Sequence, residues 1–458
     1  MTGYISVLAA SVPWLAVLAM GLSLLVLLVR YAAAPFAPDL PFGPLVRRLM
    51  AGRPLTHEPP ESHSTANRQL RRRLRRNEWA LHRQLQIIGW VVCLAILSRL
   101  MIFAAVLVSC GLSGDLSAFF NDFRGHWVRW DAAGYLALAK EGYTAANQAN
   151  WVLLPFYPMV VRLFSLILFG NVELAAFLVS NLSLLGAGWA LYLLVQEKQG
   201  QICARRALLL LMFCPMSVFF SVPYAESLFL FLTLMSILFA RRQKFLLAVL
   251  MGMLAAFTRL AGILTIIPIL LEVFKYEHSI HLWPRHKGRC VGRLIFYTLT
   301  TLLVSLGFFA YLWINRLAGG DMWAFVKVQA ETWNQEFGSL ANTLRYSIEG
   351  ALTGDSMTWR MGVWIPQSLI IILSVALLTV VSPWADPGDG LYAWGYLALT
   401  LAPTWLLTGP RMVFCMYALY PLLTRASRKR GVYAPLLVLS VILMVVGAYM
   451  YAVVGNIL

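Results

Sequence analysis

Runs of apolar residues long enough to cross a membrane recur along the chain from Tyr4 to Leu458. The hydrocarbon core of a bilayer takes about 20 consecutive apolar residues per helix. These runs dominate the composition, with 60% hydrophobic and 12% charged residues, whereas about a quarter of the residues of a soluble domain are charged. The sequence therefore predicts an all-α, polytopic integral membrane protein with about twelve transmembrane helices.

The N-terminal part of the chain divides by composition. The first apolar run, Tyr4 to Val29, lacks a basic leader and an obvious small-residue cleavage site, so residues 1–31 are predicted to form an uncleaved anchor. Residues 32–84 are rich in proline and then in arginine, and are predicted to form a basic cytoplasmic linker. The remaining residues, 85–458, are predicted to form one transmembrane domain.

Positive charges indicate the orientation of the helices. The formal net charge is +17, but the arginines lie in short segments between apolar runs, so the charge does not predict a nucleic-acid partner. Instead, the basic run Arg71 to Arg76 is predicted to lie on the cytoplasmic side and to contact membrane lipids. Alternation of the later helices then places two longer segments, Gly111 to Asn171 and Ala318 to Gly362, outside.

The cysteines do not indicate a metal centre. All six are scattered, mostly inside apolar runs, and none forms a CxxC or another metal-ligand spacing. The sequence therefore predicts neither a disulfide framework nor a bound metal.

The first predicted outside segment contains a dense polar and aromatic cluster. Carboxylates there offer a general base, cations offer phosphate contacts, and tryptophans offer surfaces for a sugar ring. The alternatives are that Asp131 caps the following helix and that the tryptophans and arginines anchor the chain at the membrane interface. The cluster consists of Asp122, Arg124, His126, Trp127, Arg129, Trp130 and Asp131.

Three further features lie among apolar residues. Leu154 to Pro158, followed by Arg162, predicts either an interfacial or re-entrant helix or a simple proline kink. Glu226 has no adjacent cation in the sequence, and such a residue in a membrane usually has a partner inside the bundle. Arg259 is expected on the same side, so the two residues are predicted to pair, either for function or as a structural ion pair.

Two later motifs complete the candidates. Arg411 is predicted at the outer end of a helix, where it and Arg259 offer guanidinium groups to a phosphate. Gln329, Trp333 and Phe337 recur at four-residue spacing, which predicts one face of a helix outside the membrane, either as a lid or as an ordinary amphipathic face.

These motifs, taken in order, resemble those of the PIG-V type of GPI mannosyltransferases within the GT-C class of membrane glycosyltransferases. The resemblance covers about Ile87 to Arg411. The chain departs from the family pattern in its additional anchor and linker, and in the methionine that follows Arg411. The matching residues are Trp130-Asp131, Tyr135, Ala139, Gly142-Tyr143, Pro155 to Pro158 with Arg162, Tyr224 to Ser227, Thr258-Arg259 with Gly262, Gln329 and Trp333.

The resemblance implies a GT-C-type bundle with outward-facing juxtamembrane loops and helices, which would make residues 85–458 its catalytic domain. It implies a polyprenyl- or dolichyl-phosphate mannose donor, a lipid or glycan acceptor and inversion, with a first-loop aspartate as general base. Asp131 is assigned this role, with Asp122 as its competitor. The expected phosphate contacts are Arg129, His126, Arg259 and Arg411, and the expected substrate contacts are Tyr157, Tyr224, Glu226, Trp130, Gln329 and Trp333.

No cofactor beyond the donor is implied. The compact length and modest outside loops resemble the family's bacterial members more than the endoplasmic reticulum enzyme, which implies a bacterial inner membrane with the active site on the extracytoplasmic face. A transporter or flippase without bond chemistry is the alternative, because polar residues such as Glu226 and Arg259 inside a bundle also suit a translocation path.

Overall fold

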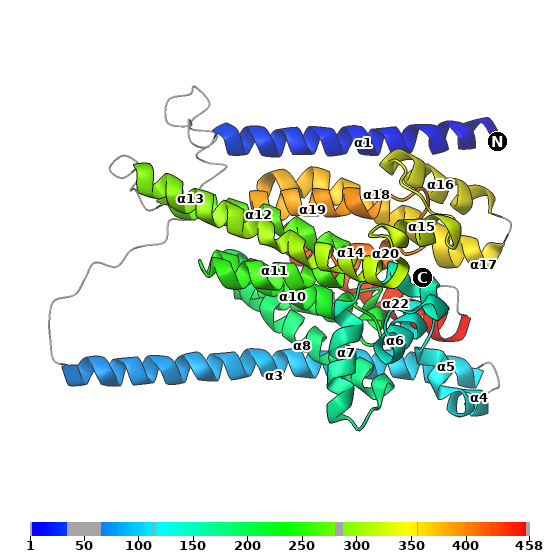
Figure 1. The fold of residues 1–458 in the computed structure, drawn as a ribbon, viewed down its shortest axis with the longest axis horizontal. Coiled ribbons are helices and arrows are strands. Elements are labelled where there is room, and N and C mark those ends of the chain that lie inside the picture. The colour runs from blue at the N-terminus through cyan, green and yellow to red at the C-terminus, as the bar shows by residue number, and fades with distance from the viewer. Residues whose placement is uncertain (1, 34–65, 113–115, 280–286, 355, 455–458) are drawn as a thin grey trace.

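Helices joined by short turns make up the described part of the chain (Figure 1). Within that part there is no strand, and one isolated bridge joins Phe337 to Pro403. The predicted all-α fold is therefore confirmed. The computed structural model describes residues 2–33, 66–112, 116–279, 287–354 and 356–454.

Two long helices lie along opposite sides of the bundle in Figure 1. One is α1 (Thr2–Ala33), which includes residues 2–31 of the predicted anchor. It packs against α16 (Leu340–Thr353), α18 (Ile365–Val381) and α19 (Pro387–Thr400). The other is α3 (Ala66–Leu112), a continuous helix of 47 residues that contains the predicted span Ile87 to Cys110. Because α3 begins at Ala66, it also includes the last part of the predicted linker.

Residues 34–65 of the linker lie outside the described residues. The division into an anchor, a linker and a transmembrane domain stays a prediction.

The centre of the bundle is built on α10 (Glu226–Arg241), which is buried on most of its sides. It packs against α8 (Val172–Gln199) and α11 (Phe245–Thr258). A helix that is apolar all round is expected at the centre of a bundle. The other helices of the bundle are α9 (Gln201–Met212), α12 (Ile266–Ser279), α13 (Lys287–Leu302), α14 (Leu306–Gly319), α16 (Leu340–Thr353), α18 (Ile365–Val381), α19 (Pro387–Thr400), α21 (Leu419–Ala426) and α22 (Arg430–Tyr449).

Five described segments are long and apolar enough to cross a membrane. A sixth is added if the bent pair Ala145–Val152 and Phe156–Ile167 counts as one span. Shorter apolar helices, such as Phe245–Thr258, pack beside them. The integral membrane class is thus confirmed, while the number of about twelve spans stays a prediction. The five segments are His82–Leu112, Val172–Gln199, Gly292–Gly319, Met357–Trp384 and Arg430–Val453.

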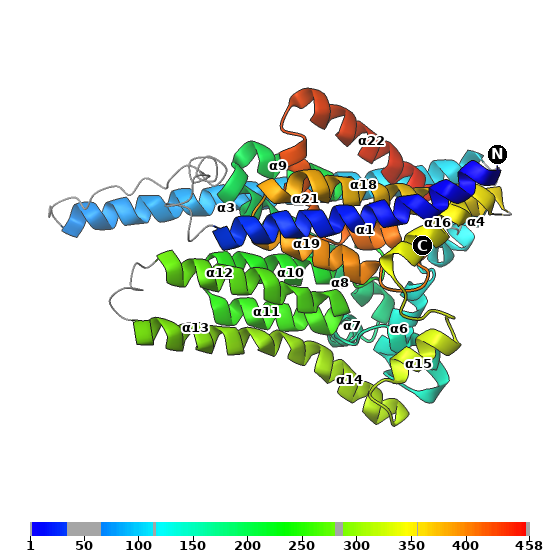
Figure 2. The same ribbon diagram turned by 90° about the horizontal axis from the view of Figure 1, so that it is seen from above.

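Short helices gather at one end of the bundle (Figures 1 and 2). They come from the two segments that the charge pattern places outside, and from α20 (Gly409–Phe414), which contains Arg411. The C-terminal end of α12 and the N-terminal end of α13 lie at the other end. Near Pro155 and Pro158, η2 (Ala145–Val152) and α7 (Phe156–Ile167) meet at 119°, so the predicted interruption is a sharp turn. The other short helices are α4 (Leu116–Asn121), α5 (Phe123–Trp127), α6 (Asp131–Glu141), α15 (Ala324–Glu331), α17 (Met357–Trp359) and α20 (Gly409–Phe414).

Candidate active site

Four charged side chains form a continuous ionic network at this end of the bundle. Arg411 Nη2 lies 2.8 Å from Asp131 Oδ2, and Arg411 Nε lies 3.2 Å from Glu226 Oε1. Arg259 Nη1 donates to the same Glu226 oxygen at 2.7 Å. The predicted pairing of Glu226 with Arg259 is confirmed, and Arg411 connects this pair to Asp131. We call these four residues the Asp131 network.

The members of the Asp131 network differ in their access to solvent. The side chain of Glu226 is 1% exposed, that of Arg411 6% and that of Arg259 14%, whereas 33% of the Asp131 side chain is exposed. The formal charges of two carboxylates and two guanidinium groups cancel, which limits the cost of burying them. Asp131 is therefore the member that an external molecule reaches most easily.

One carboxylate oxygen in the network lacks a hydrogen-bond donor. Glu226 Oε2 is buried and has no partner among the described residues, and Arg411 Nε approaches Glu226 Oε1 without a well-directed hydrogen bond. A buried acceptor without a donor costs about 1–3 kcal/mol. A bound hydroxyl group would satisfy Glu226 Oε2.

The backbone near Asp131 explains how its side chain reaches Arg411. Asp131 is the first residue of α6, and the preceding residue, Trp130, adopts a φ of 53° and a ψ of −127°. Such a conformation is strained for a residue other than glycine, and strain of this kind often occurs at functional sites. The helix-capping alternative is not observed, because Trp130 holds the N-cap position and the Asp131 carboxylate bonds to Arg411.

The local backbone also explains how the motif Thr258-Arg259 places its arginine. Arg259 is extended, with φ −152° and ψ 142°, between α11 and η4 (Leu260–Thr265). Gly262 lies so close to α11 that an added Cβ would stand 2.2 Å from the backbone carbon of Ala255. Glycine at this position therefore allows the tight turn that aims Arg259 at Glu226.

Aromatic rings support both guanidinium groups. The guanidinium carbon of Arg411 lies 5.0 Å from the ring centroid of Tyr224 and 5.5 Å from that of Phe219. That of Arg259 lies 6.0 Å from the ring of Phe229. Such cation–π contacts favour a fixed position of the cation.

The methionine after Arg411 belongs to the same environment. Arg259 Nη2 donates to Met412 Sδ. This contact was not predicted from the sequence, where the methionine marks only a departure from the family pattern.

Three other residues of the predicted cluster support the first loop. Asp122 is the N-cap of α5 and accepts a hydrogen bond from Gly125 N at 3.1 Å. His126 Nδ1 lies 2.8 Å from the carbonyl oxygen of Ala452, and Arg129 Nε donates to the Gly125 carbonyl at 2.7 Å. Within the described ranges, none of Asp122, His126 and Arg129 forms an ion pair with the Asp131 network.

The predicted tyrosines connect the loop to the bundle. The Tyr224 hydroxyl donates to the Arg129 carbonyl at 3.0 Å, directly before Trp130. The Tyr157 hydroxyl is buried and lies 2.9 Å from Ser180 Oγ, while its ring packs edge-on against Tyr135 at 5.1 Å. Trp130 is 46% exposed and offers a free aromatic surface beside Asp131.

The predicted helix face of Gln329, Trp333 and Phe337 is wrong. α15 ends at Glu331, and the chain then turns through Asn334, which has a φ of 48°. A positive φ is incompatible with a continuing right-handed helix.

The loop after α15 instead connects two parts of the site. Trp333 Nε1 donates to the Ala149 carbonyl in η2 at 3.2 Å. Gln329 Nε2 donates to Gln335 Oε1, and Gln335 Nε2 donates to the Trp405 carbonyl. The loop therefore joins the segment after α6 to the segment before α20.

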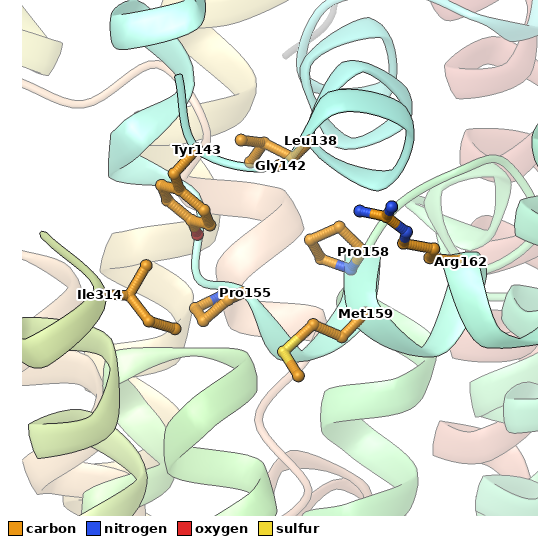
Figure 3. A pocket seen from close by; sticks show the side chains of 8 residues that line it. All are labelled: Leu138, Gly142, Tyr143, Pro155, Pro158, Met159, Arg162 and Ile314. Carbon is orange, nitrogen blue, oxygen red and sulfur yellow. The ribbon is translucent and has the colours of Figure 1, made fainter. Parts of the chain in front are cut away.

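A cavity of about 180 Å³ lies beside α6 and α7 (Figure 3). Arg162 is its one charged lining residue, and Pro155 and Pro158 form part of its wall. Its lining residue Leu138 belongs to α6, the helix that begins at Asp131. The remaining lining residues are Leu138, Gly142, Tyr143, Met159 and Ile314.

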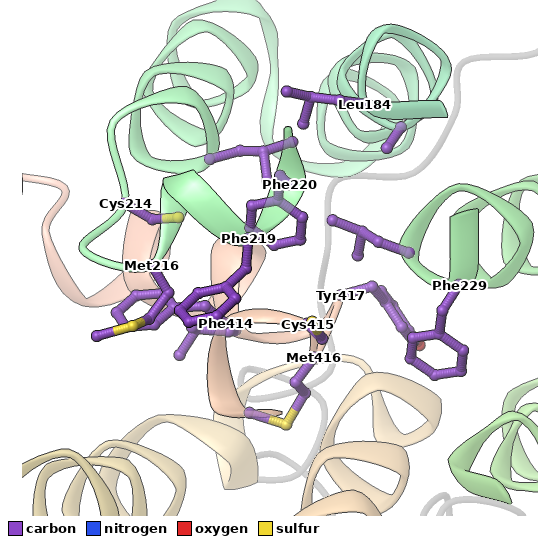
Figure 4. Packing of buried hydrophobic residues seen from close by; sticks show 14 of the residues in the cluster. Leu184, Cys214, Met216, Phe219, Phe220, Phe229, Phe414, Cys415, Met416 and Tyr417 are labelled. Atoms are coloured by element: carbon purple, nitrogen blue, oxygen red, sulfur yellow. The ribbon is translucent and has the colours of Figure 1, made fainter. Parts of the chain in front are cut away.

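A cluster of densely packed apolar side chains, part of which Figure 4 shows, contacts the guanidinium groups of the network. Its members include Phe219 and Phe229, which make these contacts, and Cys415, which follows α20. In the part of the chain that the structure describes, no group of three His, Cys, Asp or Glu residues is arranged to hold a metal ion.

Comparison with known proteins assigns this chain to a family. The family model for mannosyltransferase (PIG-V) matches residues 91–320, which is half of the chain. The chain belongs to the mannosyltransferase (PIG-V) family. The matched range includes Asp131, Glu226 and Arg259 and ends before Arg411. Membership confirms the predicted resemblance and favours the enzyme over the transporter.

The solved structures include one that is similar, ArnT from Cupriavidus metallidurans bound to undecaprenyl phosphate. It shares 15% sequence identity with this chain at a TM-score of 0.46, over 76% of this chain and 62% of that chain. The match thus spans less than two thirds of the length of ArnT. None of the curated proteins matches this chain.

Sequence reasoning missed two residues near the network. Phe219 gave no signal, because one phenylalanine in an apolar run is indistinguishable from its neighbours. Arg99 does carry a sequence signal, because it is an ionisable residue inside the predicted span Ile87 to Cys110.

Proposed function

We propose that this protein transfers mannose from a polyprenyl phosphate carrier to a lipid or glycan acceptor on the extracytoplasmic face of a membrane. One observation carries the proposal: the partly exposed carboxylate of Asp131 lies 2.8 Å from the buried guanidinium of Arg411. A general base and a phosphate-binding cation thus stand side by side. Membership in the mannosyltransferase (PIG-V) family supports the sugar and the reaction class.

The reaction is an inverting displacement at the anomeric carbon. The acceptor oxygen forms a bond to this carbon, the bond between the carbon and the phosphate oxygen breaks, and its electron pair leaves with the polyprenyl phosphate. The acceptor proton passes to Asp131, and a positioned base of this kind contributes typically 10²–10⁴-fold to the rate. No metal or cofactor takes part in this proposal.

The leaving phosphate gains negative charge during the reaction, and cations aimed at that charge stabilise it. Arg411 and Arg259 are suited to this role because guanidinium groups bind phosphate oxygens bidentately and stay charged. A phosphate that draws Arg411 away from Asp131 would free the carboxylate to accept a proton. Glu226 Oε2, which lacks a donor, is suited to accept a hydrogen bond from a sugar hydroxyl.

The proposed sidedness rests on the charge pattern. The Asp131 network lies at the end of the bundle where the short helices gather. The segments that form this end, Gly111 to Asn171 and Ala318 to Gly362, contain no long basic run. We infer the extracytoplasmic site from the positive-inside rule. We propose a bacterial inner membrane because the compact length and modest outside loops resemble those of the family's bacterial members.

The proposal is tested with purified protein in lipid vesicles, supplied with polyprenyl phosphate mannose and an acceptor extract. We expect the donor to be consumed and labelled mannose to appear in an acceptor product. Movement of the intact donor across the vesicle membrane without bond cleavage would reject the enzyme in favour of a flippase. Cleavage of polyprenyl phosphate glucose at the same rate would reject mannose as the preferred sugar.

A further inference from the structure

Arg99 lies well inside a membrane-spanning helix. It belongs to α3, within the segment His82–Leu112 that is long and apolar enough to cross a membrane. Placing a guanidinium at such a depth is costly, so arginines there usually serve a function. The Asp131 network does not include Arg99.

The guanidinium of Arg99 is held by neutral oxygens of one short turn. Its Nη1 donates to the Ser217 carbonyl at 2.9 Å and to Ser221 Oγ, and its Nη2 donates to Ser217 Oγ. None of the carboxylates that the structure describes forms an ion pair with it. The planar guanidinium thus hydrogen-bonds to Ser217 of η3 (Ser217–Phe220) and to Ser221, the residue after it. The point charge of a lysine cannot make all of these bonds.

A second contact, from another helix, fixes the same turn. Asn181 Nδ2, on α8, donates to the Ser221 carbonyl at 2.9 Å. The turn is therefore clamped between α3 and α8, and its position depends on both helices.

The clamped turn carries the ring that lies beneath Arg411. Phe219 is 1% exposed, and its ring centroid lies 5.2 Å from that of Tyr224 and 5.5 Å from the Arg411 guanidinium. Phe219 belongs to the same apolar cluster as Phe414 and Cys415, which follow Arg411 in the chain (Figure 4). Interiors packed at this density transmit small displacements instead of absorbing them.

We propose that Arg99 is a positioning residue for the transfer reaction. By holding Ser217 and Ser221, it holds the Phe219 ring under Arg411 and so sets the geometry of the contact between Arg411 and Asp131. The proposal rests on the function proposed above, but the contacts from α3 to Arg411 can be tested separately from it.

The kinetic test compares Arg99→Met and Arg99→Lys with a matched arginine. The control is Arg205→Met, because Arg205 also contacts α3, with its guanidinium 5.8 Å from the ring of Trp90, but not η3. We expect Arg99→Met to lower kcat by roughly tenfold to a hundredfold, as small misplacements of reacting groups do, with the acceptor KM unchanged. Arg99→Lys should recover part of the lost rate, and Arg205→Met should behave like the unchanged protein.

A second measurement, hydrogen exchange in detergent, does not need activity. We expect Arg99→Met to speed exchange in residues 217–226 and also in residues 409–414, where Arg411 lies. If Arg99→Met does not fold, Ser221→Ala removes one acceptor and should give the same pattern at smaller size. Faster exchange confined to residues 217–221, with kcat no lower than in Arg205→Met, would overturn the proposal.

The two proposals fail in different ways. If the unchanged protein consumes no donor while exchange in residues 409–414 still responds to Arg99→Met, the proposed function fails and the coupling of Arg99 to Arg411 is supported. If the unchanged protein transfers mannose and Arg99→Met transfers it at the same kcat, the positioning role fails and the function remains.

Discussion

The two ends of α10 each carry a charge that belongs to a different ionic network. Glu226 is the first residue of the helix and Arg241 is the last, about 22 Å apart at 1.5 Å per residue. Glu226 belongs to the Asp131 network. Arg241 pairs with Asp389 of α19, and these two residues with Tyr417 are called the Asp389 network.

The carboxylate of the Asp389 network is fully satisfied. Arg241 Nη2 lies 2.7 Å from Oδ1 and 2.8 Å from Oδ2 of Asp389, and the Tyr417 hydroxyl donates to Oδ1 at 2.9 Å. Both charged side chains are under 10% exposed, at 6% and 8%. Both carboxylate oxygens have donors, and within the described part of the chain the one unsatisfied atom of the three residues is a donor, the buried Nε of Arg241, so no carboxylate oxygen remains for a ligand hydroxyl.

The Asp131 network is organised differently. Two guanidinium groups approach one oxygen of Glu226, the other oxygen has no donor, and Asp131 is partly exposed. The comparison teaches that burial of charge alone does not identify a reactive site. A closed pair joins helices, whereas an open network with an unsatisfied oxygen can exchange partners with a substrate.

The largest expected effect is on the rate, at Asp131. Asp131→Asn should lower the rate of mannose transfer by about 10²–10⁴-fold, because the amide cannot accept the acceptor proton. The rate is measured with radiolabelled polyprenyl phosphate mannose, and folding is checked by size-exclusion chromatography in detergent. The matched control is Asp122→Asn, which alters only the cap of α5 and should transfer within a few-fold of the unchanged rate. Near-normal turnover by Asp131→Asn would remove Asp131 as the base.

The next effect is on stability, at the other end of α10. Asp389→Ala leaves the buried Arg241 without its carboxylate and should lower the free energy of unfolding by about 3–5 kcal/mol. Unfolding is followed in mixed micelles with increasing denaturing detergent, and kcat is expressed per folded molecule. We expect this kcat to stay normal. A large loss of kcat at unchanged stability would show that the two networks do not divide function and stability as their geometry indicates.

A smaller effect is expected for Arg259. Arg259→Ala should lower kcat/KM for the donor roughly tenfold to a hundredfold, which corresponds to about 1.5–3 kcal/mol for a hydrogen bond to a charged group. The loss should appear when donor concentration is varied, while Arg259→Lys should restore part of it because the positive charge returns. An unchanged donor response in Arg259→Ala would exclude Arg259 from the phosphate site.

The smallest effect is expected at Arg242, the neighbour of Arg241. Arg242 Nη2 lies 2.8 Å from Glu197 Oε1, but the two side chains are 41% and 37% exposed. Arg242→Ala should therefore change the free energy of unfolding by at most about 1 kcal/mol and leave transfer unchanged. A loss as large as that of Asp389→Ala would show that burial does not separate these two adjacent arginines.

Short sequence motifs were sufficient to predict some of the candidate site residues. Asp131, Glu226 and Arg259 each stand in a short motif, and the glycine in the Arg259 motif has a steric reason that involves only nearby residues. The pairing of Glu226 with Arg259 followed from the cost of an unpaired charge in a membrane. The helix predicted through Trp333 failed because its backbone turns at Asn334, a feature that periodicity does not reveal.

The sequence by itself determined that this protein is a bundle of membrane helices of the mannosyltransferase (PIG-V) family, and it predicted a site in the first loop around Asp131. Apolar runs in a membrane must satisfy their own backbone hydrogen bonds, so helix formation is decided locally. Only the tertiary structure decided that Arg411 bridges Asp131 and Glu226, and that Phe219 lies beneath it. Ion pairs and ring contacts act over a few ångströms between segments far apart in the chain, so their partners are fixed by packing and not by spacing along the sequence.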